Sequence, residues 1–181
     1  MNKIKEPLMT IARTEDLLPA IREAIVQLCY AAFQEADFLN LFSYFPAGGR
    51  HFLAYRGDEP VSHAVVTTRW LQPAGLPLLK TAYVDAVATL PVVQGQGYGS
   101  ALLRHLAQNI GDYEIACLQT DIPAFYQRLG WELWRGPLAG RGEAGLVPTP
   151  TQTGVMILRL HRTPPLDLDT LLTIEVAGRI W

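Results

Sequence analysis

Three closely spaced glycines suggest the first chemistry in this sequence. The stretch VVQGQGYGSALLRHLAQ, residues 92–108, contains Gly95, Gly97 and Gly99 and then continues directly into a helix-like pattern. A glycine-rich turn at the N-terminus of a helix exposes backbone N–H groups, and the helix dipole there favours negative charge. Because glycine has no side chain, phosphate oxygens can approach the main chain. The stretch therefore predicts a phosphate-binding turn.

Two common phosphate-binding turns do not fit this stretch. A P-loop ends in Gly-Lys-Ser or Gly-Lys-Thr, whereas here Ser100 follows Gly99 without a lysine. A dinucleotide-binding turn has the spacing G-x-G-x-x-G and follows the first strand of a parallel repeat. Here the spacing is G-x-G-x-G, and the turn follows segments that we expect to form antiparallel hairpins.

Hydrophobic periodicity predicts the elements that position this turn. Four helices are expected. The first begins near Pro19 with Thr14 or Asp16 as its cap, and the second is a short helix after residue 34. The third directly follows the glycines, and the fourth lies between Asp121 as its cap and Gly130 as its end. Strands are expected at residues 4–12, 51–56, 61–71, 78–90, 113–120, 131–135 and 155–160. This order predicts an α+β fold with a mixed, mostly antiparallel sheet flanked by helices, in a single domain over residues 1–181. The glycine- and proline-rich segment 136–154 is expected to be a flexible surface loop or a lid over a substrate.

Composition excludes several classes of protein. Hydrophobic residues make up 49% of the 181 residues and charged residues 18%, which fits a globular chain with a sizeable core. The net charge of -2 argues against nucleic acid as a partner. We expect neither a signal peptide nor a membrane span. Cys29 and Cys117 lie in apolar surroundings, and we expect buried thiols in a reducing cytoplasm.

The four histidines show no metal-ligand spacing, so we expect no metal site. They are His51, His63, His105 and His161. His63 lies on a central strand and could face a cleft, but a packed or hydrogen-bonded histidine is the favoured interpretation.

The glycine turn and the segments around it resemble a known family. Gln94, Gly97 and Gly99 fit the pattern Gln/Arg-x-x-Gly-x-Gly/Ala, and the chain then passes through a helix and a strand to a short helix ending in FYQRLGW, residues 125–131. This combination resembles the GCN5-related N-acetyltransferases (GNAT). The resemblance implies that the loop amides hold the pyrophosphate of acetyl-coenzyme A. The cofactor-binding residues would be Val87, Gln94, Gly95, Gln96, Gly97, Tyr98, Gly99 and Ser100.

Acetyl transfer needs a base for the amine, a donor for the oxyanion and an acid for the leaving thiolate. Alternation places Tyr83, Asp85 and Val87 on one face of a strand, and Asp85 is a charged residue within an apolar run, which suggests the base. The resemblance implies that amides near Val87 face the thioester and that Tyr126 is the acid. The alternative interpretations are a solvated or paired carboxylate for Asp85 and core packing for Tyr126.

The whole chain resembles one branch of this superfamily, the aminoglycoside 2'-N-acetyltransferases. The supporting stretches are AAFQEADF, AYVDAVAT, FYQRLGWELWRGP, LVPTPTQTG and the tail from LDLDTLL to GRIW. The resemblance implies that Asp37 and the carboxylate of Trp181 contact the substrate. It also implies a strand glutamate at the position of Asp85, so the acid here is one methylene shorter.

Two further departures bear on the substrate. The family has acids where this chain has Thr151 and Gln152, and another where it has Arg179. Aminoglycosides are polycations whose sites need several carboxylates, so these differences favour a less cationic amine.

The predicted function is therefore direct transfer of an acetyl group from acetyl-coenzyme A to a primary amine, in a ternary complex, with an aminoglycoside 2'-amine as one candidate acceptor. The alternatives are the same reaction on a less cationic amine, or a non-catalytic acetyl-coenzyme A sensor. We expect a cytoplasmic enzyme whose partner is a small-molecule amine. We expect it to bind no nucleic acid, membrane or metal. A homodimer is one possible association state.

Overall fold

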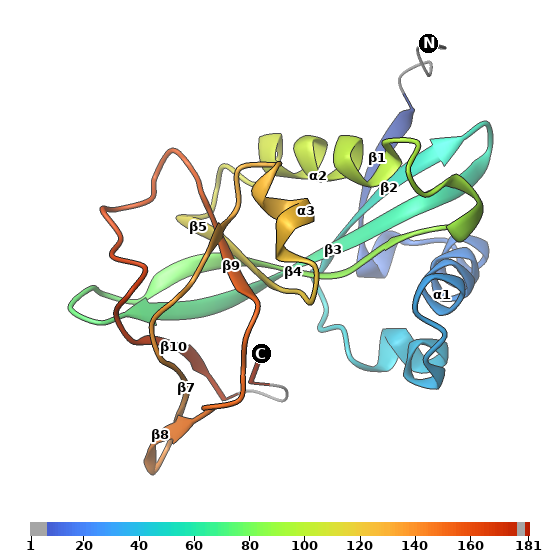
Figure 1. The fold of residues 1–181 in the computed structure, drawn as a ribbon. Coiled ribbons are helices and arrows are strands. Elements are labelled where there is room, and N and C mark those ends of the chain that lie inside the picture. The colour runs from blue at the N-terminus through green and yellow to red at the C-terminus, as the bar shows by residue number, and fades with distance from the viewer. Residues whose placement is uncertain (1–6, 177–179) are drawn as a thin grey trace. The chain divides into compact units, whose positions relative to one another are not determined.

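The computed structural model describes residues 7–176 and 180–181, and these divide into two compact units (Figure 1). Unit 1 contains the described residues up to Thr67 together with 84–109, and unit 2 contains 68–83 and the described residues from Ile110 onward. Strands β3 (Glu59–Pro73) and β4 (Leu79–Thr89) contribute residues to both units.

Unit 1 combines antiparallel strands with two α-helices. Its remaining elements are β1 (Leu8–Arg13), η1 (Thr14–Asp16), α1 (Pro19–Phe33), η2 (Ala36–Ser43), β2 (Arg50–Arg56), η3 (Pro91–Val93) and α2 (Tyr98–Gln108). Strand β2 pairs antiparallel with both β1 and β3. Helix α2 packs against β2 and buries Leu102, Leu103 and Leu106.

Helix α1 begins as the sequence predicts but is capped differently. Pro19 occupies the first turn, where its missing N–H costs nothing. The N-cap is Leu18, without a side-chain hydrogen bond, so the capping roles expected for Thr14 and Asp16 are wrong. The Thr14 hydroxyl instead lies within hydrogen-bond distance of the Gly49 carbonyl and the His51 ring.

Unit 2 is built mainly of strands. Its further elements are β5 (Ile115–Gln119), α3 (Pro123–Gln127), β6 (Glu132–Leu133), β7 (Leu138–Gly142), β8 (Gly145–Pro148), β9 (Val155–Arg159) and β10 (Leu172–Glu175). The strand order is β6-β9-β5-β4-β3-β10-β7-β8. The pairs β4/β5 and β7/β10 are parallel, and the other pairs with a defined register, in both units, are antiparallel. The expected α+β class with a mixed, mostly antiparallel sheet is confirmed.

Two local expectations in unit 2 are wrong. Segment 136–154 is not a plain loop, because it contains the hairpin of β7 and β8, which turns at residues 143–144 and continues into β8 at Gly145 with φ +118°. The alternative of a lid over a substrate stays a prediction. The N-cap of α3 is Ile122 rather than Asp121, although Gly130 does follow the helix in a left-handed conformation.

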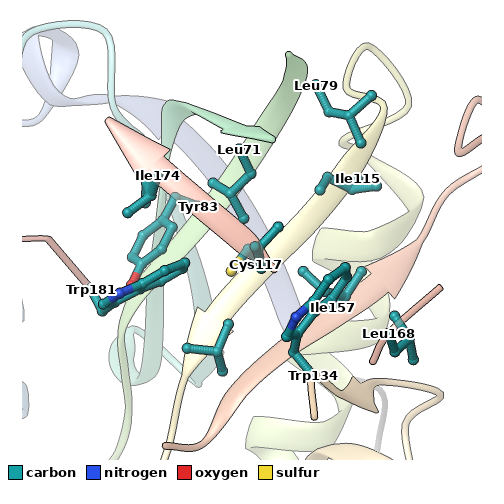
Figure 2. Packing of buried hydrophobic residues seen from close by; sticks show 12 residues of the cluster. Leu71, Leu79, Tyr83, Ile115, Cys117, Trp134, Ile157, Leu168, Ile174 and Trp181 are labelled. Carbon is teal, nitrogen blue, oxygen red and sulfur yellow. The ribbon is translucent and has the colours of Figure 1, made fainter. Parts of the chain in front are cut away.

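A hydrophobic cluster of unit 2 contains Tyr83, Cys117, Trp134, Ile157 and Trp181 (Figure 2). The indole N–H of Trp134 donates to the Thr170 carbonyl at 2.9 Å, so this buried polar atom is satisfied. Cys29 and Cys117 are both buried and free, as predicted. Burial raises the pKa of the Cys29 thiol to about 12 and raises the pKa of Cys117 as well. Within the described ranges, no helix is long and apolar enough to cross a membrane.

Candidate active site

The glycine turn connects η3 to α2 within unit 1, and its glycines have different roles. Gly95 and Gly97 have φ of +75° and +91°, which only glycine adopts without strain, whereas Gly99 lies inside the first turn of α2. A Cβ on Gly95 or Gly97 would meet nothing within 4 Å. These two glycines are therefore required by the backbone path, and the space beside them is open.

The backbone of this turn presents amides at the helix start. The first i→i−4 bond of α2 runs from Ala101 N to Gly97 O at 2.9 Å. The N–H groups of Tyr98, Gly99 and Ser100 therefore precede the helical hydrogen-bond ladder. Residues 94–97 are exposed, while the Tyr98 side chain is buried and anchors the turn. Such a start of a helix suits an anion.

Both glutamine side chains of the turn hold the local backbone. Gln94 Nε2 donates to the Thr89 carbonyl at 3.0 Å, and Gln96 Nε2 donates to the Val92 carbonyl at 3.2 Å. The turn is thus fixed by its own side chains before any ligand binds, which reduces the entropy lost on binding.

Strand β4 carries the predicted base just before this turn, at a kink. Ala86 has φ +47°, a left-handed conformation that costs a non-glycine residue about 1–3 kcal/mol. The Asp85 carboxylate accepts a hydrogen bond from Ala86 N at 2.8 Å. Asp85 and Val87 are half-buried, whereas Val84 and Ala86 are buried. The residues of the predicted base and of the predicted oxyanion amide are therefore half-buried, one on each side of the kink.

The predicted substrate acid Asp37 lies in η2 of unit 1 and is exposed. The neighbouring rings of Phe33 and Phe38 stack with centroids 4.5 Å apart. Asp37 thus precedes one member of an aromatic pair in the sequence, on the short second helix that the sequence predicts.

The other two predicted residues belong to unit 2. Tyr126 lies on α3, is 6% exposed, and contacts Phe125 and Trp131 edge-on, so its ring is packed. The indole of Trp181 belongs to the same hydrophobic cluster as Tyr83 (Figure 2) and donates to Thr149 Oγ1 at 3.1 Å. The ring of Tyr126 is therefore packed, as the alternative interpretation expected, and the Trp181 side chain has a structural role.

Three positions differ from the acids expected in the aminoglycoside 2'-N-acetyltransferase branch: Thr151, Gln152 and Arg179. Thr151 is exposed and Gln152 half-buried, in the turn after β8, where Gln152 Nε2 donates to the Thr153 carbonyl. Arg179 lies outside the described residues. No cluster of three or more His, Cys, Asp or Glu side chains that could hold a metal occurs in the described part of the chain.

The sequence did not reveal a buried pair of histidines in unit 1. His51 and His63 are fully buried, and their nearest ring nitrogens lie 3.0 Å apart. Desolvation lowers the pKa of His51 to about 4 and that of His63 to about 3, and the positive charges of Arg22 and His51, respectively, act in the same direction. The sequence predicted a packed or hydrogen-bonded His63, which is confirmed, but nothing in its pattern paired it with His51.

Comparisons with known proteins place these features in a family. Residues 47–133, which span parts of both units, match the model described as an acetyltransferase (GNAT) domain. The chain is 30% identical over 180 residues to an aminoglycoside 2'-N-acetyltransferase from Mycolicibacterium fortuitum, covering 94% of this chain and 90% of the relative.

Solved structures show the same fold at low sequence identity. A GNAT family N-acetyltransferase (YhbS) from Escherichia coli, solved in complex with CoA, is 16% identical with a TM-score of 0.61, covering 96% of this chain and 93% of that one. Eis1 from Mycobacterium abscessus is 20% identical with a TM-score of 0.59, covering 71% of this chain but 32% of that one. The chain thus spans about a third of the length of Eis1. The match to the M. fortuitum relative over nearly the whole sequence, with the GNAT domain model, shows that the chain belongs to the GCN5-related N-acetyltransferase family.

Proposed function

We propose that this N-acetyltransferase takes its acetyl group from acetyl-coenzyme A and transfers it directly to a primary amine in a ternary complex. The observation that carries the proposal is the pre-formed turn at residues 94–100, with left-handed Gly95 and Gly97 before a helix N-terminus. The Escherichia coli neighbour solved with CoA supports the choice of donor. The pyrophosphate would accept hydrogen bonds from the amides of the turn.

Each predicted side chain has one role in this proposal. Asp85, through water, takes the proton from the incoming amine, and Val87 N–H donates to the thioester oxygen as negative charge develops there. Tyr126 donates a proton to the departing thiolate of coenzyme A. The C–N bond forms first and the C–S bond then breaks as the negative charge returns from the oxygen. The amine loses one proton to Asp85 and the thiolate gains one from Tyr126, so a neutral amine and the thioester give amide and free thiol. Proton exchange with solvent then returns both side chains to their starting forms. The role of Tyr126 rests on the family resemblance.

An aminoglycoside 2'-amine is the first acceptor to test. The 30% identity to the M. fortuitum relative supports it, and Asp37 supplies one exposed carboxylate on unit 1. Asp37 and the terminal Trp181 are the proposed substrate contacts. A cytoplasmic location and a homodimer, both considered from the sequence, stay predictions.

A less cationic amine is the second candidate, and we expect it to react faster than an aminoglycoside, because the branch acids are replaced by Thr151 and Gln152. Fewer carboxylates mean weaker attraction of a polycation. The reaction class, the donor and the roles of Asp85 and Val87 are the same for both acceptors.

The test is release of free thiol from acetyl-coenzyme A with an acceptor panel of tobramycin, a polyamine, an amino sugar with a single amine and a peptide N-terminus. We expect kcat/KM to be higher for the amino sugar than for tobramycin, with each acetylated product identified by mass. Faster turnover of tobramycin would favour the aminoglycoside over the second candidate. Binding of acetyl-coenzyme A without thiol release for any amine would favour a sensor and overturn the enzyme proposal.

A further inference from the structure

The buried histidine pair of unit 1 is not used in the chemistry proposed above. His51 lies on β2 and His63 on β3, where the register pairs Leu53 with His63. The two histidines are therefore diagonal neighbours on one face of the sheet. Nδ1 of His51 lies 3.0 Å from Nε2 of His63, and both side chains are fully buried.

The pair is the centre of a longer hydrogen-bonded chain. At one end, Nε2 of His51 lies 3.0 Å from Thr14 Oγ1. At the other end, Nδ1 of His63 lies 3.0 Å from the Ala86 carbonyl oxygen. The chain, here called the histidine relay, thus connects Thr14 to the kinked residue of β4 through both imidazole rings.

The end on β4 determines where the protons of the relay lie. Burial lowers the pKa of both histidines, so at neutral pH each ring is uncharged and carries one N–H. Because a carbonyl oxygen only accepts, His63 must carry its proton on Nδ1. Nε2 of His63 then accepts from Nδ1–H of His51, whose Nε2 accepts from the Thr14 hydroxyl at 3.0 Å. The hydroxyl has a second acceptor, the Gly49 carbonyl at 3.2 Å, but that carbonyl already accepts from Thr14 N–H at 2.8 Å, so it does not need the hydroxyl proton. A single tautomer of each ring therefore satisfies every contact in the relay.

The opposite tautomer of His63 would gain one weak hydrogen bond and lose a stronger one. Cys29 Sγ lies 3.7 Å from His63 Nδ1, so the thiol could donate to an unprotonated Nδ1. That arrangement would place the nitrogen lone pair against the Ala86 oxygen at 3.0 Å. Since S–H is a weak donor, it does not offset a lost N–H···O bond between buried groups.

The relay acts on a peptide group that matters for the proposed reaction. The peptide between Ala86 and Val87 is trans, because the described residues contain no cis peptide bond. In a trans peptide the C=O and the N–H point in opposite directions. Holding the Ala86 oxygen toward His63 therefore orients the Val87 N–H away from His63. The Ala86 N–H is separately held by Asp85.

We propose that the histidine relay is a positioning device, in which His63 orients the Ala86–Val87 peptide so that the Val87 N–H can stabilise the thioester oxygen. The inference deepens the proposed function and rests on it. His63 does not touch the reacting atoms and acts through the backbone, while His51 and Thr14 hold its ring in the Nδ1–H tautomer.

The first test reads the tautomers in the wild-type protein and needs no variant. Long-range ¹H–¹⁵N spectra of the imidazole rings distinguish Nδ1–H from Nε2–H. We expect the Nδ1–H form for both His51 and His63, although free imidazole in histidine prefers Nε2–H. An Nε2–H proton on His63 would overturn the inference, whether or not the protein transfers acetyl groups.

The second test measures kinetics for matched variants at His63. His63→Leu removes the donor, and His63→Asn retains it, because the amide nitrogen of Asn occupies the position of Nδ1. We expect kcat to fall about tenfold to hundredfold in His63→Leu, with unchanged affinity for coenzyme A. This loss is smaller than the roughly 10²–10³-fold loss when an oxyanion donor is removed, because the Val87 N–H is misoriented and not deleted. His63→Asn should recover kcat to within about threefold of wild type, since the donor returns. His161→Leu, at an exposed histidine of unit 2, is the control.

The outcomes separate this inference from the proposed function. If the wild type acetylates an amine and folded His63→Leu retains wild-type kcat, the positioning role is wrong. If His63→Asn loses as much activity as His63→Leu, the donor at Nδ1 is not what matters and the inference also fails. If the wild type transfers acetyl to no amine, the proposed function fails, and this result is visible before any His63 variant is made.

Discussion

At the scale of single residues, Asp85 and Tyr126 can be tested with nearly isosteric replacements. Asp85→Asn retains an acceptor for the Ala86 N–H but removes the base. Tyr126→Phe retains the ring contacts with Phe125 and Trp131 but removes the proton donor. Each variant should lower kcat by about 10²–10⁴-fold while coenzyme A still binds, and steady-state kinetics with titration calorimetry measures both quantities. Wild-type kcat in both variants would show that neither residue has its proposed role.

Residues whose conformation follows from local chain geometry are predictable from the sequence. Gly95 and Gly97 have the positive φ that a glycine turn predicts, but Gly99 is helical and does not need to be glycine for its φ. The kink at Ala86 was not predicted, because alanine in an apolar strand gives no sign of a left-handed conformation. The contact of His51 with His63 depends on the register of β2 and β3, which no local pattern encodes.

At the scale of elements, the kink in β4 predicts an unusual order of stabilities. Valine favours strands and glycine disfavours them, yet at Ala86 the left-handed φ reverses this preference. We expect Ala86→Val to lower the free energy of unfolding by about 1–3 kcal/mol, because a β-branched side chain adds strain beyond what alanine already bears at a left-handed φ and also overpacks a buried site. Ala86→Gly loses a buried methyl worth about 0.8 kcal/mol but relieves strain, so its net effect is small.

The control for this prediction is Ala88, which is also buried on β4 but has no positive φ. Urea unfolding of the valine and glycine variants at both positions gives the comparison. The difference between valine and glycine should be larger at Ala86 than at Ala88 by about 2 kcal/mol. An equal difference at both positions would mean that the kink is not strained.

The glycine turn gives the second prediction at this scale. Asparagine and aspartate tolerate a left-handed φ better than most residues, so Gly97→Asn and Gly97→Asp are similarly strained and differ in charge. A carboxylate beside the pyrophosphate should weaken coenzyme A binding at least tenfold relative to the asparagine variant. Titration calorimetry measures this ratio, and Gly75→Asp, at another open left-handed glycine, is the control for fold. Equal affinities of the two Gly97 variants would place the pyrophosphate elsewhere.

At the scale of the whole molecule, the histidine pair couples stability to pH. The unfolded chain binds protons at both histidines near pH 6.5, whereas burial lowers the pKa in the folded state to about 4 and about 3. Stability due to the neutral pair is therefore complete above pH 6.5 and is lost as pH falls toward these lower values. Each histidine should contribute a slope of about 1.4 kcal/mol per pH unit below pH 6.5.

Urea unfolding between pH 7 and pH 5 measures this slope, in a range where most carboxylates remain ionised. His63→Asn removes one of the two groups and should reduce the contribution of the pair by about half. Arg22 and Asp85 are unchanged in this variant, so their charges act equally on both proteins. The same slope in wild type and variant would show that His63 takes up protons in the folded state as readily as in the unfolded state.

The topology of unit 2 shows where prediction from sequence ends for the whole molecule. The glycine and proline content of residues 136–154 favoured a loop, but β7 and β8 form there because their backbone groups pair with each other and with β10. The strand β10 follows a long irregular segment, and its neighbours β3 and β7 are distant in sequence. Such pairing is decided by tertiary contacts that local propensity does not contain.

The central claim is that this protein transfers acetyl groups from acetyl-coenzyme A to an amine by means of the turn at residues 94–100. The most direct measurement compares free thiol released with acetylated amine formed, for wild type and Gly97→Asp, across the acceptor panel. We predict one thiol for each acetylated amine in the wild type, and loss of both products in Gly97→Asp at acetyl-coenzyme A concentrations near the wild-type KM. Equal turnover by wild type and folded Gly97→Asp, or thermal stabilisation of the wild type by acetyl-coenzyme A without any acetylated amine, would contradict the claim.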